Sequence, residues 1–182
     1  MATGISQSFV TEGEEVTGAS QAPASSSSHS QAQFSEKTLR TLYVFAGVQR
    51  KADLRFFLEV LQGPGGFTLF MKEVDLLRGS DQDVADDDFW DALMKVLDSG
   101  EFDLVVITPP CNTHSRARSS FLPGPRPIRN ALHPWGFPWL EGKNLRDCEL
   151  SNLMVRRTFD AVSRAHQVGA KFLMEHPEDL GR

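Results

Sequence analysis

From Lys37 onward, apolar and polar positions alternate between two patterns of spacing. Short apolar runs predict strands at 42–45, 67–74, 104–107 and 172–174, with a weaker strand near 82–84. Between these runs, apolar residues recur every three or four positions, which predicts helices at 54–61, 86–97 and 147–167. This order predicts an α/β fold with a doubly wound, mostly parallel, Rossmann-like sheet.

The first predicted helix has one apolar face, which consists of Leu54, Phe57, Leu58 and Leu61. This i, i+3, i+4, i+7 spacing is typical of a helix that packs on a sheet. The glycine-rich run at 63–66 is expected to stop the helix, because glycine and proline are weak helix formers.

A long irregular segment, at about 112–146, separates the third apolar run from the last helix. Connections of this length inside a compact domain are usually functional. The segment has six Lys and Arg residues and one Glu, a net charge of +5 in a chain whose total is -5. This concentration of positive charge favours contact with nucleic-acid phosphates. The alternative is a solvated lid with packed tryptophans.

The first 36 residues are rich in Ser, Gln, Ala and Gly, and they include four Glu but neither Lys nor Arg. Such a composition predicts a disordered leader, or an inert tether, ahead of a domain at 37–182. It lacks the basic and apolar regions of a signal peptide, and no run is long enough to span a membrane. We therefore expect an intracellular protein with no membrane partner, nuclear in a eukaryote and otherwise cytoplasmic.

Candidate functional residues follow four of the predicted strands. Phe45 and Gly47 follow the first strand, Asp75 the second, Pro110 and Cys111 the central one, and Glu175 the last. Ligands of doubly wound sheets bind outside the carboxyl ends of the strands. We therefore expect these residues to converge on one crevice. The two cysteines cannot form a disulfide framework, and the histidines lack the compact spacing of a metal site.

Residues 41–182 resemble the cytosine-C5 DNA methyltransferases, which use S-adenosylmethionine. The resemblance rests on Phe45-Ala46-Gly47, on Asp75, on Pro109-Pro110-Cys111 with the following residues 112–115, and on Glu175-His176-Pro177. No target-recognition domain or returning strands follow Arg182. The resemblance therefore implies a methyltransferase sheet that is incomplete at the C-terminus, in a reduced relative or in part of a larger polypeptide with further domains.

The resemblance implies a role for each matching residue. Cys111 would attack C6 of cytosine, and Glu175 would steady the base at N3. The residues expected to contact S-adenosylmethionine are Phe45, Gly47, Asp75, Asp83 and Pro110. Those expected to hold DNA, or RNA, are Ser115, Arg116, Arg118, Arg126 and Arg129.

Several alternatives stay open. The family's glycine-rich turn continues beyond Gly47 with further glycines, whereas this chain has bulkier residues at 48–51. A non-catalytic nucleic-acid-binding module is therefore an alternative to an active enzyme, and so is a nucleotide-processing enzyme on the same sheet. Cys111 is alternatively a buried small hydrophobe, and Asp75 is alternatively a helix cap. Cys148 is expected to be structural.

Overall fold

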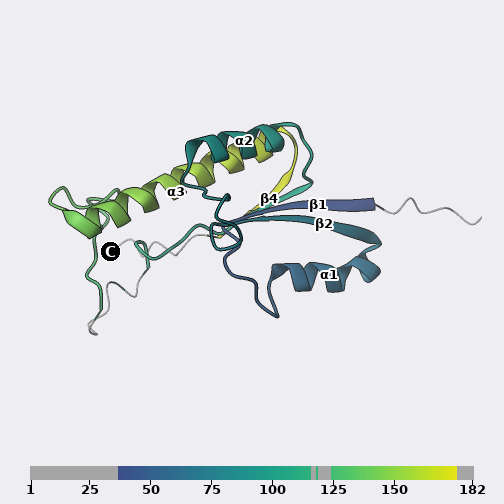
Figure 1. Cartoon of the computed structure of the whole chain (residues 1–182), viewed down its shortest axis with the longest axis horizontal. Helices are drawn as coiled ribbons and strands as arrows, with labels where there is room; N and C mark the ends of the chain where they lie inside the picture. Colours follow the sequence, from purple (N-terminus) through teal and green to yellow (C-terminus); the bar gives the residue numbers. More distant parts are fainter. Residues whose placement is uncertain (1–36, 116–117, 119–123, 176–182) are drawn as a thin grey trace, which may run out of the picture. The chain divides into compact units, whose positions relative to one another are not determined.

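Four parallel strands form the sheet of this computed structural model, which describes residues 37–115, 118 and 124–175. The strands are β1 (Lys37–Val44), β2 (Phe67–Val74), β3 (Leu104–Ile107) and β4 (Lys171–Met174), in the order β2-β1-β3-β4 (Figure 1). Each neighbouring pair is parallel. The predicted leader at 1–36 lies outside the described residues.

Three helices cover the sheet. They are α1 (Leu54–Gly65), α2 (Asp87–Asp98) and α3 (Gly142–Gln167). Figure 1 shows α2 and α3 together on one face of the sheet, with α1 on the opposite face. The α/β, doubly wound, Rossmann-like fold predicted from the sequence is confirmed. Among the described residues, no helix is long and apolar enough to cross a bilayer.

The core lies between the sheet and the pair α2 and α3. Leu42, Val44, Val105 and Ile107 alternate with residues of the other face and point into it, each fully buried. The apolar ridge of α2, which includes Leu93 and Leu97, packs against them together with small residues of α3. Complete burial of a branched aliphatic side chain contributes about 1.5–3 kcal/mol, so this layer stabilises the sheet.

Helix α1 is less well buried than its pattern predicts. Asp53 caps its N-terminus by accepting a hydrogen bond from the backbone of Phe56, and Gly66 ends it with a φ of 62°. The helix packs against the edge strand β2, so that no residue of α1 is fully buried. Phe57 and Leu61, predicted to face the sheet, are exposed.

Several boundaries differ from the sequence-based expectations, and β1 begins five residues earlier than predicted, at Lys37. Residues 82–84 form turns rather than a strand, since Asp83 folds back to accept a hydrogen bond from the backbone of Ala85. Helix α3 begins at Gly142, so the irregular segment is five residues shorter than expected. Helix α1 continues through Pro64 to Gly65, because the left-handed residue that terminates it is Gly66.

Candidate cofactor and active site

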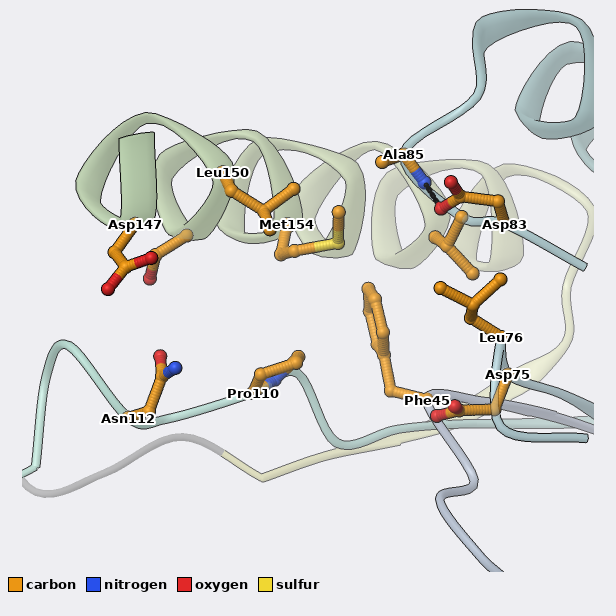
Figure 2. Close-up of a pocket in the computed structure, with 12 residues that line it drawn as sticks. Phe45, Asp75, Leu76, Asp83, Ala85, Pro110, Asn112, Asp147, Leu150 and Met154 are labelled. Carbon is orange, nitrogen blue, oxygen red and sulfur yellow. Dashed lines mark hydrogen bonds between the residues drawn. The ribbon is translucent and has the colours of Figure 1, made fainter. Parts of the chain in front are cut away.

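A cavity of about 380 Å³ lies at the carboxyl ends of β1, β2 and β3, where α3 forms the opposite wall (Figure 2). Its lining consists of Phe45, Asp75, Leu76, Asp83, Val84, Ala85, Pro110, Asn112, Asp147, Leu150, Ser151 and Met154. Four of the five residues expected to bind the cofactor are therefore brought together from four separate segments. The fifth, Gly47, is not in the lining but contacts it through Asp75.

Phe45 turns the chain at the end of β1. Its φ is 61°, a left-handed conformation that a bulky residue adopts only at a cost of about 1–3 kcal/mol. The cost is offset by its backbone N–H, which donates to the Val74 carbonyl at 2.9 Å, and by burial of the ring. Strained residues of this kind are concentrated at ligand sites, and Phe45 lines the cavity here.

Asp75 connects the carboxyl ends of β1 and β2 through hydrogen bonds. Its carboxylate accepts hydrogen bonds from the backbone N–H of Gly47 at 2.9 Å and of Leu77 at 2.8 Å. The alternative role as a helix cap is wrong, because the next helix begins only at Asp87. The Gly47 carbonyl accepts from Nε of Arg78 at 2.6 Å. The bulkier residues at 48–51 are exposed and do not line the cavity, so they do not fill it.

The segment that contains Asp83 is held in place by Arg157 of α3. This buried guanidinium donates to the carbonyls of Val84 and Asp86 and forms an ion pair with Asp87. It also lies 5.3 Å from the ring centre of Trp90. Sequence reasoning missed Arg157. A single arginine within the apolar ridge of α3 was the available signal, since a buried arginine needs several acceptors.

The opposite wall of the cavity was also missed. It includes Asp147, Leu150, Ser151 and Met154 of α3. Asp147 forms an ion pair with Lys143 one turn earlier, with a separation of 2.5 Å. Ser151 accepts a hydrogen bond of 2.5 Å from the hydroxyl of Thr113, which fixes the chain beyond β3 to the helix. These residues were read as an ordinary helix, and their site role depends on tertiary packing.

The charge of the lining restricts what the cavity can hold. Three carboxylates face it, those of Asp75, Asp83 and Asp147, whereas the described lining contains no Lys, Arg or His. Phosphate groups are usually held by basic side chains or by a helix N-terminus. This lining instead suits hydroxyl, amine and cationic groups, with apolar surface between them.

Cys111 and Glu175 lie at the tips of adjacent strands. Glu175 follows β4, and its backbone N–H donates to the carbonyl of Ile107 at 3.0 Å, beside the chain that leads to Cys111. Both residues are exposed, so the alternative of a buried hydrophobic Cys111 is wrong. Neither lines the cavity, but Pro110, which precedes Cys111, does. His176 and Pro177 lie outside the described residues.

Two of the arginines predicted to hold nucleic acid bind the protein itself. Arg118 donates to the carbonyls of Asn112 at 2.7 Å and Arg126 at 3.1 Å. Arg129 donates to Pro134, Asn152, Thr113 and Cys148. Burial lowers the pKa of Arg129, and Cys148 partly opposes this effect. The Arg118 contacts lie within the irregular segment, whereas the Arg129 contacts with Asn152 and Cys148 fix that segment to α3.

The remaining predicted nucleic-acid residues differ in position. Arg126 is exposed and Ser115 is half-buried, whereas Arg116 lies outside the described residues. Cys148 is buried and donates to the Trp135 carbonyl at 3.2 Å, in agreement with a structural role. Among the residues that the structure describes, no three His, Cys, Asp or Glu side chains gather as a metal site would require.

No family model, curated protein or solved structure matches the chain.

Proposed function

We propose that the cavity binds S-adenosylmethionine and that the protein transfers a methyl group to C5 of cytosine in DNA. The observation that supports this proposal is the convergence of Phe45, Asp75, Asp83 and Pro110 on a single cavity at the carboxyl edge of the sheet. The resemblance implies a cofactor role for all four residues, and three of them, Phe45, Asp75 and Pro110, also follow separate strands. Ligand cavities of doubly wound sheets occupy this same edge.

The lining fits this cofactor in size and in charge. A volume of about 380 Å³ is within the range of roughly 300–1,000 Å³ that is typical of small-molecule sites. Asp75 and Asp83 offer carboxylate oxygens to hydroxyl and amine groups, while Phe45 and Leu76 offer apolar surface to a ring. The cofactor is a cation, and the acidic lining favours it over nucleotides with phosphate chains.

The reaction would be carried out by Cys111, which adjoins Pro110 of the lining, together with Glu175. When bound, S-adenosylmethionine supplies a methyl group activated by its sulfonium. The thiolate of Cys111 would add to C6 of the base, while the Glu175 carboxyl group donates a hydrogen bond to N3. The electron pair would then reach C5, which would bond to the methyl group as the bond from that group to sulfur breaks and S-adenosylhomocysteine leaves. Loss of the C5 proton to a base restores the ring and expels Cys111. The exposure of both side chains suits a base presented from outside.

Calorimetric titration with S-adenosylmethionine tests the first half of the proposal. We expect binding by the unmodified protein and at least ~10-fold weaker binding by Asp83→Asn, which loses the charge but keeps an acceptor for Ala85. Asp88→Asn is the matched control, because Asp88 is exposed and outside the lining. Absence of binding by the folded protein would overturn the proposal.

A covalent complex with DNA that contains 5-fluorocytosine tests the second half. Fluorine at C5 cannot leave as a proton does, so the thiol adduct accumulates, and we expect it with the unmodified protein but not with Cys111→Ser. Cofactor binding without any adduct would overturn the transfer to cytosine. Salt-sensitive DNA binding without cofactor binding or an adduct would favour the non-catalytic module.

A further inference from the structure

We infer that Asp147 of α3 binds the ammonium-bearing end of the ligand, opposite the Asp75 and Asp83 end of the cavity. This inference rests on the proposed function and assigns a new residue to the same site. It requires an elongated ligand with a polar group at one end and a cation at the other. S-adenosylmethionine meets that requirement, because its adenosine part has polar groups and its amino-acid part has an ammonium group.

The cavity has two polar ends and an apolar middle. Figure 2 shows Asp147 and Asn112 at one end, with Asp75 and Asp83 at the other. Between them lie the apolar side chains of Leu150, Met154, Pro110 and Phe45, whereas Leu76 lies beside Asp75 and Asp83. A ligand that fills the cavity must therefore place its polar groups at its ends.

The carboxylates at the two ends differ in their partners. Asp75 and Asp83 accept hydrogen bonds from backbone N–H groups, which fix them in place. Asp147 instead pairs with the side chain of Lys143. The Asp147 side chain is 27% exposed, whereas that of Lys143 is 78% exposed. An exposed lysine loses little when it returns to water, so a ligand cation can replace it at Asp147.

The partial burial of Asp147 strengthens its attraction for a cation. Water screens a carboxylate less when most of its surface is covered, so its attraction for a nearby positive group is larger. Asn112 faces the same end and offers an amide that can both donate and accept, as an amino-acid group with two charges requires.

A comparison of ligands with and without the amino-acid end tests the inference. Calorimetry would measure S-adenosylmethionine, S-adenosylhomocysteine and 5′-methylthioadenosine, the last of which has no ammonium group. For Asp147→Asn we expect ~10-fold weaker binding of the first two ligands, and less than ~2-fold change for 5′-methylthioadenosine.

Two further variants sharpen the comparison. Lys143→Met removes the competing cation, so we expect ~3-fold tighter binding of both amino-acid ligands, with 5′-methylthioadenosine unchanged. Glu149→Gln is the matched control. Glu149 lies two residues from Asp147 on the same helix, is exposed and does not line the cavity, so we expect less than ~2-fold change for every ligand.

The outcomes separate this inference from the proposed function. Equal weakening of all three ligands by Asp147→Asn, in a variant whose thermal melting matches the unmodified protein, would overturn the role of Asp147 but leave the cofactor site intact. An unchanged affinity for all three would do the same. Failure of the unmodified protein to bind any of the three would overturn the proposed function and the inference with it.

Discussion

The backbone N–H of Gly47 donates a 2.9 Å hydrogen bond to the Asp75 carboxylate, which joins the ends of two parallel strands. The same carboxylate accepts from Leu77, so its loss leaves two backbone donors without this partner. We expect Asp75→Ala to lower the free energy of unfolding by about 2–3 kcal/mol, and Asp75→Asn by about 1 kcal/mol because one acceptor oxygen remains. Urea denaturation measures both. Asp81→Ala, at an exposed position, should change it by less than about 0.5 kcal/mol.

Arg157 and Asp87 form an ion pair whose two members should contribute unequally. The side chain of Arg157 is 6% exposed, whereas that of Asp87 is 92% exposed. Arg157→Met removes a donor from the Val84 carbonyl and one of the two donors of the Asp86 carbonyl, so we expect a loss of about 2–4 kcal/mol. Asp87→Asn should cost less than about 1 kcal/mol. Equal losses in chemical denaturation would contradict this account.

Gly136 is required where the irregular segment meets α3. Its φ is 115°, and an added Cβ would lie 2.5 Å from Sγ of Cys148. We expect Gly136→Ala to destabilise the protein by about 2–4 kcal/mol, through both the strained backbone and the contact. Combination with Cys148→Ala should cost less than the sum of the two single changes, because the clash with sulfur disappears. Additive losses in a double-mutant cycle would show that the contact is unimportant.

Asp53 should give α1 a pH-dependent stability. The hydrogen bond from the backbone N–H of Phe56 lowers the pKa of Asp53 below its ordinary value of 3.8, although partial burial opposes this effect. The charged form therefore stabilises the folded state. This contribution is present above about pH 3.8 and is lost as the pH falls through the lower folded value.

The variant Asp53→Ser isolates that effect, because it keeps a capping oxygen that does not titrate. We expect the free energies of unfolding of the unmodified protein and of Asp53→Ser to differ at pH 6 and to converge below pH 3. Circular dichroism during urea titration at several pH values measures this. A difference that stays constant across the range would contradict the role of the Asp53 charge.

Strand β4 is at an edge of the described sheet, and it carries apolar side chains that face water. Phe172 is 46% exposed and Leu173 is 58% exposed. Unprotected edge strands tend to pair with other chains. We therefore expect concentration-dependent self-association that Leu173→Lys reduces. Light scattering across a concentration series measures it, with Leu132→Lys as the control at an exposed loop position. An equal effect of both variants would exclude a specific role for the edge.

Local sequence patterns predicted most of the sheet. The strand at 104–107 has the predicted bounds because a run of four apolar residues is enclosed by polar Asp103 and by Thr108 with its following prolines. The segment at 82–84 was predicted wrongly. Its single apolar residue, Val84, is held by Arg157 from a distant helix, and no local pattern reveals such a contact.

The sequence predicted the residues of the candidate site that follow strands, but not those that α3 contributes. Residues after strands were identified because the fold class places all strand ends at one edge, so Phe45, Asp75 and Pro110 could be grouped without a structure. The α3 wall could not be found in the same way. Asp147 and Ser151 belong to a regular helix, and the face that they present to the cavity depends on how α3 packs. The inward contacts of Arg129 likewise depend on tertiary structure.

The contrast between the two cysteines has a practical consequence. Cys111 is exposed at the rim of the site, whereas Cys148 is buried against the Trp135 carbonyl. A thiol-reactive fluorophore should therefore label the native protein once, at Cys111, without mutagenesis. Unfolding makes the Cys148 thiol reactive. The rate at which the ratio of dye to protein rises above one therefore measures the opening of the α3 region. The same dye, placed beside the cavity, reports ligand binding through its emission.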